Sequence, residues 1–264
     1  MCQHTPKSLP AKASGMSNWV VESHRLTLFR FPGTSFDVEG AWRAIAGREP
    51  DELTKKAATG KVSASGVLEG GRLLVQHDPL RVDLVYLAVQ AEDEVGSRFP
   101  ELGPVGQQTE FFVNLTMNFL HEAPDALRLA YGLVLGEQAT SKVDAYLQLG
   151  KRLPTVKLDA ENSTDFSYQI NRPRSSRVLP DLSVNRLSQW ACNQLVHQMF
   201  VVQNGARLEA LPSRESEVAY RCRLELDLST SQDRREALPA DRVPDLFMEL
   251  VELAREISEK GDVA

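Results

Sequence analysis

The chain reads VAYRCRLELDLS from Val218 to Ser229, and this stretch decides the fold class. Apolar side chains occupy its even-numbered positions, and charged side chains occupy most of its odd-numbered positions. Because successive side chains of a strand point to opposite faces, this alternation predicts a β-strand with one buried face and one charged, solvent-facing side.

Other stretches of the chain show the periodicities of strands and helices. Further strands are predicted at 26–31, 62–68, 72–77, 81–89, 127–135 and 187–202, and helices at 37–46, 107–122, 139–149 and 241–259. The pair Gly70-Gly71 predicts a tight hairpin between two strands, since both turn positions of such a hairpin favour φ above zero. The polar stretch 51–56 is expected to be a solvated face.

The predicted strands occur in neighbouring runs with helices interspersed, rather than in strict alternation with helices. This order is typical of an α+β fold with a mainly antiparallel sheet packed by amphipathic helices. A change in composition near residues 150–163 suggests two lobes that share one sheet. We assign residues 1–18 to a flexible N-terminal tail, 19–150 to an N-terminal lobe and 151–264 to a C-terminal lobe.

The composition is that of a soluble globular protein, with 264 residues, a net charge of −6 and 42% hydrophobic residues. A negative net charge disfavours a general nucleic-acid coat, which needs surplus Lys and Arg. No apolar run approaches the ~20 residues of a membrane span, so no membrane association is expected. The cysteines lack metal-ligand spacing and fit a reducing cytoplasm, and Cys192 and Cys222 are expected to pack as small hydrophobic side chains.

The common motifs of catalysis and cofactor binding are missing from the sequence. It has no glycine-rich phosphate loop, no paired histidines on one helix face, no Gly-x-Ser-x-Gly elbow and no paired Cys-x-x-Cys. We therefore assign no catalytic residue, no metal site and no cofactor, and an enzyme is the less favoured class.

The segment 165–190 is rich in arginine, although the chain around it is acidic. Its candidate partner- or anion-binding residues are Arg172, Arg174, Arg177, Arg186, Asn171, Asn185, Tyr168 and Trp190. Guanidinium groups bind carboxylates and phosphates through two parallel hydrogen bonds, amides add donors, and aromatic rings stack on bases or peptide side chains. The segment is therefore predicted to project from the anionic body with its arginines unneutralised. The competing interpretation is structural: Asn171 caps a turn, Arg172 and Arg186 pair with the chain's own acids, and Trp190 lies in the core.

A few carboxylates of the chain suggest that it could bind a metal ion. Arg81 and Asp83 share one face of a predicted strand, which suits either an acid tuned by a guanidinium or a structural ion pair. Asp165, Glu225 and Asp227 would meet if their strands paired, and three carboxylates suit a hard cation. An ordinary ladder of ion pairs with the arginines on the same face is the competing interpretation.

The order of elements resembles that of a sporadically distributed family of uncharacterised bacterial α+β proteins. The resemblance rests on Leu-x-Leu-Asp-Leu at 224–228, on Leu-Phe-x-x-Leu in the final helix at 246–250, and on the hairpin and the Phe-rich helix that precede them. That family has no established activity, so no catalytic residue is carried over. Its patchy distribution implies accessory or defence genes that are encoded beside their partners.

Our first hypothesis is a cytoplasmic, non-enzymatic subunit or adaptor of a prokaryotic complex, in the setting of anti-phage defence, that binds a protein partner through the arginine-rich segment. The alternative is a nucleic-acid-binding or metal-dependent nucleic-acid-cleaving protein that uses the same arginines, with Asp83, Asp165 or Asp227 as metal ligands. A weaker option is a holdase-like chaperone or immunity protein, which requires an exposed apolar patch. The uneven charge also fits binding to a second copy of the chain, that is, a homo-oligomer.

Overall fold

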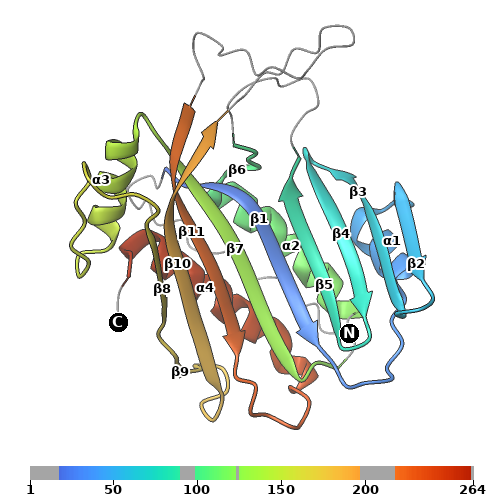
Figure 1. The fold of residues 1–264 in the computed structure, drawn as a ribbon. Helices are drawn as coiled ribbons and strands as arrows, with labels where there is room; N and C mark the ends of the chain where they lie inside the picture. The colour runs from blue at the N-terminus through green and yellow to red at the C-terminus, as the bar shows by residue number, and fades with distance from the viewer. Residues whose placement is uncertain (1–17, 90–98, 123–124, 197–217, 263–264) are drawn as a thin grey trace, which may run out of the picture.

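A computed structural model describes residues 18–89, 99–122, 125–196 and 218–262 of the chain (Figure 1). These residues form one open sheet of 11 strands, in which every recorded pairing is antiparallel, together with four α-helices. The predicted α+β fold with an antiparallel sheet is therefore confirmed. The expected flexible tail lies almost entirely outside the described residues.

The sheet runs in the order β2-β3-β4-β5-β1-β7-β11-β10-β8, while β6 pairs with β1 and β9 pairs with β10. Its strands are β1 (Val20–Phe29), β2 (Glu52–Lys56), β3 (Lys61–Leu68), β4 (Gly71–Asp78), β5 (Arg81–Ala88), β6 (Gly103–Pro104), β7 (Arg128–Ala139), β8 (Ser167–Asn171), β9 (Arg174–Ser175), β10 (Ser183–Val196) and β11 (Val218–Thr230). The helices are α1 (Val38–Ala46), α2 (Val105–Glu122), α3 (Lys142–Arg152) and α4 (Val243–Lys260), and the short 3-10 helix η1 (Ala240–Arg242) precedes α4.

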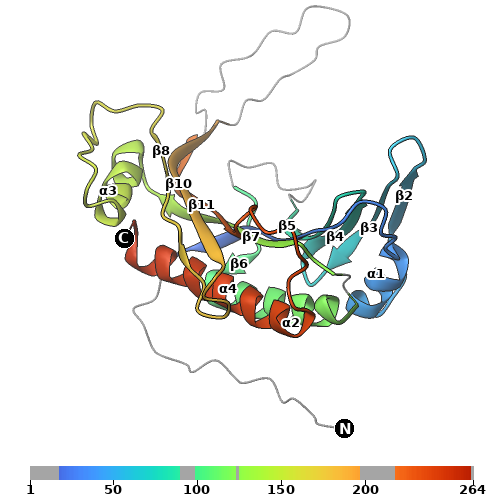
Figure 2. The same ribbon diagram turned by 90° about the horizontal axis from the view of Figure 1, so that it is seen from below.

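The helices lie on one side of the sheet. Figure 2 shows α1, α2 and α4 as a layer beneath the sheet, with α3 beside the edge formed by β8 and β10. No helix of the described residues covers the opposite side, which we call the open face. An antiparallel sheet tolerates this arrangement because one of its faces can be polar and solvated.

The described chain repeats one order of elements. Its first half runs β1, α1, the strands β2 to β5, then α2, and its second half runs β7, α3, the strands β8 to β11, then α4. In each half the last strand returns to pair with the first, and β1 and β7 pair at the centre of the sheet. The division into lobes 19–150 and 151–264 stays a prediction, and residue 150 lies inside α3.

The core lies between the sheet and the helix layer. Leu224, Leu226 and Leu228 of β11 are buried there, as the alternation of their strand predicts. Burial of one leucine side chain contributes about 1.5–3 kcal/mol, so this strand alone is a major source of stability. Trp42 of α1 and Phe247 of α4 are also buried in this core.

Local signals fix the ends of several elements. The Asp37 side chain accepts a hydrogen bond from the Gly40 N–H at 3.0 Å and caps α1, and Gly47 ends that helix with φ of 67°. The hairpin between β3 and β4 forms as predicted, but its two turn residues are Glu69 and Gly70, with φ of 45° and 82°. Gly71 belongs to β4, where a Cβ atom would lie 2.5 Å from the Tyr86 ring.

Several predicted boundaries were wrong. No strand was predicted in the stretch 51–56, but residues 52–56 form β2, an edge strand whose residues are all exposed, as expected of a solvated face. The strand predicted at 26–31 begins six residues earlier, at Val20. Gly150 does not close the third helix, which starts at Lys142 and continues to Arg152. The strand favoured for 187–202 is confirmed up to Val196, and residues 197–202 lie outside the described part of the chain.

The described helices include none with the length and apolar character that a membrane span requires. Cys192 and Cys222 are free thiols. Cys222 is buried, and its Sγ donates to the Ala145 carbonyl of α3 at 3.4 Å, so it packs as the small buried side chain that was predicted.

Candidate functional site

The arginine-rich segment is part of the sheet edge and does not project from the body. It contains β8, β9 and the first residues of β10, and β8 and β9 both pair with β10. Its arginines lie against α4 and the residues that follow α4, which brings together parts of the chain about ninety positions apart (Arg172 and Asp262, |i−j|=90). The expected outward projection is therefore wrong.

Arg172 binds Asp262 through two parallel hydrogen bonds. Its Nε and Nη2 donate to the two carboxylate oxygens at 2.7 and 2.9 Å, and the Tyr168 hydroxyl donates to the same carboxylate at 2.9 Å. The Arg172 hydrogen bond holds the pKa of Asp262 below its ordinary value. Both Arg172 and Tyr168 are therefore used in holding the C-terminal end of the described chain.

Arg174 and Arg177 also have acidic partners on α4. Arg174 lies 3.5 Å from Glu256, and Arg177 lies 2.6 Å from Glu252 and 3.6 Å from Glu249. The prediction that these guanidinium groups are left unneutralised is wrong. The structural interpretation, which gave acidic partners to Arg172 and Arg186, is confirmed for Arg172 only. Glu249, Glu252 and Glu256 recur at helical spacing, so their shared face was a usable sequence signal. The sequence does not indicate, however, which strand that face meets.

The remaining predicted site residues are also engaged within the fold. Trp190 is 0% exposed, its ring centroid lies 6.3 Å from that of Trp19, and its Nε1 donates to Ser188 at 3.3 Å, so it cannot stack on a ligand. Asn171 does not cap a turn but bridges two strands, donating to Asn185 and accepting from the Arg186 N–H, both at 2.9 Å.

The three carboxylates considered as metal ligands do not assemble. Among the described residues, no group of three or more His, Cys, Asp or Glu side chains could hold a metal ion. Asp83 accepts a hydrogen bond from Thr27 at 2.6 Å and pairs with Arg81 at 3.1 Å, which is the structural ion pair. Asp227 pairs with Arg25 at 3.6 Å, and Asp165 lies outside β8 with φ of 53°.

The open face carries a ladder of ion pairs across its central strands. Glu22 pairs with Arg221 at 2.8 Å, and Arg25 pairs with Asp227 at 3.6 Å. Each pair joins the region of β1 to β11 across β7, which carries Gly132 and Gly136 on this face. A Cβ atom at Gly136 would lie 3.0 Å from Arg221, so glycine is what allows this guanidinium to cross the strand.

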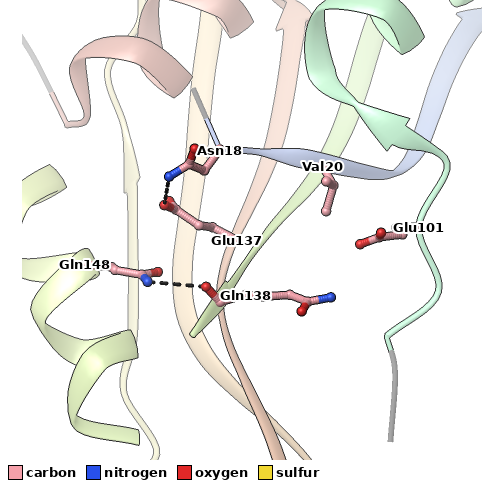
Figure 3. Close-up of a pocket in the computed structure, with 6 residues that line it drawn as sticks. All are labelled: Asn18, Val20, Glu101, Glu137, Gln138 and Gln148. Carbon is pink, nitrogen blue, oxygen red and sulfur yellow. Dashed lines mark hydrogen bonds between the residues drawn. The ribbon is translucent and has the colours of Figure 1, made fainter. Parts of the chain in front are cut away.

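A cavity of about 430 Å³ lies where the start of β1, the end of β7 and α3 meet. Figure 3 shows its lining residues, which are Asn18, Val20, Glu101, Glu137, Gln138 and Gln148. Val20 pairs with Gly136, and Gln138 lies two residues beyond it, so the cavity continues the open face at one end. Sequence analysis missed this cavity because its lining comes from four separate regions of the chain.

The polar atoms that remain unused in this cavity are mainly hydrogen-bond acceptors. Glu137 is neutralised by Arg152 and also accepts from Asn18 at 3.3 Å, whereas Glu101 forms no ion pair with any described residue. Gln148 donates to the Gln138 carbonyl at 3.3 Å, but its buried Oε1 has no partner. In Figure 3 the side chains of Glu101 and Gln138 point toward one another across the cavity. Such a lining suits a ligand group that is positively charged and rich in donors.

Comparison of the chain with protein-family models, with curated proteins and with solved structures found no match.

Proposed function

We propose that the protein is a non-enzymatic subunit or adaptor of a prokaryotic protein complex, and that it binds a basic side chain of a protein partner in the cavity at the end of its open face. The prokaryotic, anti-phage setting comes from the family resemblance, and the binding mode comes from the geometry of the cavity. The proposed contact surface is the open face rather than the arginine-rich segment, in which acids of the fold neutralise Arg172, Arg174 and Arg177.

The acceptor-lined cavity is the observation that carries this proposal. Its volume of about 430 Å³ falls within the ~300–1,000 Å³ of ligand pockets. Glu101 supplies a carboxylate that forms no ion pair with any described residue, although it acts electrostatically on Arg221. Gln148 supplies a buried acceptor without a hydrogen-bond partner among the described residues. An ammonium or guanidinium group suits such a lining, since it brings positive charge and several donors.

The surroundings of the cavity favour a protein over a nucleic acid. The charges of the open face occur as paired acids and bases, such as Glu22 with Arg221 and Arg25 with Asp227, so this face lacks the surplus of positive charge that phosphates require. The Glu101 carboxylate at the cavity would also repel phosphate. Mixed charges of this kind provide specificity between proteins.

The test is co-purification with the products of neighbouring genes. The wild-type chain, a Glu101→Lys variant and a matched Glu110→Lys control are each expressed with those genes, and partners are identified by mass spectrometry. Glu110 is exposed on α2, on the other side of the sheet, so its reversal changes net charge equally. We expect Glu101→Lys to lower recovery of the partner at least tenfold and the control to leave it unchanged.

The proposal fails if Glu101→Lys, shown by circular dichroism to be folded, retains the partner as well as the control does. It also fails if the purified complex shows the absorbance ratio at 260 and 280 nm of a nucleic-acid complex and binding weakens steeply with salt. That result would support the alternative of a nucleic-acid-binding protein.

A further inference from the structure

Arg186 differs from the other arginines of its segment because it is buried and has no acidic partner in an ion pair. Its residue is 5% exposed, and no described carboxylate forms an ion pair with it. Its Nε is buried without a hydrogen-bond partner. Burial is the main cause that lowers the pKa of Arg186, and the charge of Arg174 acts in the same direction. A buried cation without a partner is destabilising, so this guanidinium calls for a counterion.

The acids closest to Arg186 are already occupied. Asp262 accepts from Arg172 and Tyr168, and Glu256 pairs with Arg174 at 3.5 Å and with Lys260 at 3.2 Å. The described charges that act on Arg186 are the cations Arg172 and Arg174 and the anions Glu256 and Asp262. With Arg186 itself, three cations stand against two anions, so one positive charge remains in excess at this point between β10 and α4.

A small cavity lies at the same point. Its volume is about 10 Å³, and it is lined by Arg172, Arg186, Ser188, Ile257, Gly261 and Asp262. About 10–15 Å³ is the room that one water-sized group needs. Ser188 is buried, and its oxygen accepts from Trp190, which leaves the hydroxyl proton free to donate into the cavity.

We infer that this cavity holds one small monovalent inorganic anion, of which chloride is the example, bound by Arg186 and Ser188. A water molecule can accept the same hydrogen bonds, but it does not supply the negative charge that the excess of cations requires. Phosphate and organic carboxylates are too large for a space the size of one water molecule. The anion joins the sheet edge to α4 and completes the set of contacts made by the other arginines. This inference is independent of the proposed function, since the two cavities share no residue.

The first experiment measures thermal and urea unfolding in sodium chloride and in sodium gluconate at the same ionic strength, because gluconate cannot enter the cavity. A ligand that binds only the folded state stabilises it in a saturable manner, and at ten times the Kd the unfolding equilibrium constant falls about tenfold. We expect the stability of the wild-type chain to be higher in chloride than in gluconate and to saturate with chloride concentration. An Arg186→Met variant should lose this chloride effect, and the control Arg25→Met, on the open face, should keep it.

The second experiment is crystallographic and needs no variant. Crystals of the wild-type chain soaked in sodium bromide should show an anomalous peak between Arg186 and Ser188. The absence of this peak, or a chloride effect of equal size in the folded Arg186→Met variant, overturns the inference. Should Arg186→Met fail to fold, the bromide peak and the chloride titration of the wild-type chain decide the question.

Discussion

The Asp262 carboxylate accepts two hydrogen bonds from Arg172, at 2.7 and 2.9 Å, and thereby fixes the residues after α4 to the sheet edge. The side chain of Asp262 is 2% exposed, while that of Arg172 is 34% exposed. The carboxylate of this pair is therefore shielded from solvent, whereas the guanidinium is partly solvated. The two residues lie 90 positions apart in the chain. Arg172, one of the arginines predicted to bind a partner, is therefore a structural link.

We predict that Asp262→Asn lowers the stability at neutral pH, and that this difference disappears in acid. The folded pKa of Asp262 lies below its ordinary value of 3.8, chiefly through the Arg172 hydrogen bond. A depressed carboxyl pKa gives stability that is complete above 3.8 and is lost as the pH falls through the folded value. Urea unfolding of the wild-type protein and the variant at pH 7 and near pH 3 measures the difference between their free energies of unfolding. Equal differences at both pH values would contradict the assignment.

Glu249 and Glu252 form a matched pair, because both contact Arg177 but only Glu249 is buried. Glu249 also accepts from the Ser176 hydroxyl at 2.5 Å and from the Arg177 N–H at 2.7 Å. Glu249→Ala leaves these donors without a partner and should destabilise the fold by about 1–3 kcal/mol. Glu252→Ala removes an exposed pair and should cost about 0–1 kcal/mol. Chemical denaturation measures the free energy of unfolding of both variants. Similar losses would show that burial does not increase the contribution of Glu249 to stability.

His24 should make the protein less stable as the pH falls from neutrality. The ring is buried, stacks on Phe112 and hydrogen-bonds to Tyr131 at 3.0 Å, and burial lowers the pKa of His24 from 6.5 to about 3. Between these values the unfolded chain binds a proton that the folded chain does not, so stability falls with pH by up to about 1 kcal/mol per unit.

A His24→Gln variant provides the reference for this prediction, since its side chain does not titrate. Carboxylates and the other histidines act equally in both proteins, so the difference between the two stability profiles from pH 7 to pH 4 isolates His24. Parallel profiles would show that His24 takes up a proton in the folded protein.

Two glycines of β7 provide a test of the open face. Gly136→Ala should destabilise the protein by about 1 kcal/mol or more, because the new Cβ would lie 3.0 Å from Arg221, whose guanidinium is held by Glu22 and by the Phe99 ring at 3.8 Å. Gly132→Ala should be neutral or slightly stabilising, since its nearest atom is Arg25 Nε at 3.4 Å, and the exposed Arg25 can move. Thermal unfolding measures the stability of both variants. A Gly136→Ala variant as stable as the wild-type protein would show that the Arg221 side chain is free to move.

Sequence patterns predicted the secondary structure correctly where the pattern lay within a single strand or helix. The alternation in residues 218–229 predicted β11 and its buried face, and the periodicity of residues 37–46 predicted α1. Apolar periodicity is decisive in these places because it follows from the backbone geometry of a single element. The strand β2 escaped detection for the same reason: as an exposed edge strand it has no apolar face to mark it.

The sequence by itself determined the fold class, most of the strands and helices, and the presence of an arginine-rich segment in an acidic chain. Only the tertiary structure decided what those arginines do. Arg172, Arg174 and Arg177 find their acids on or just after α4, more than seventy positions along the chain (|i−j| of 90, 82 and 75), while Arg186 is left with a cavity instead of a carboxylate. The physical reason is that charge complementarity acts through space between elements, and no periodicity along one element records which partner the fold will bring to it.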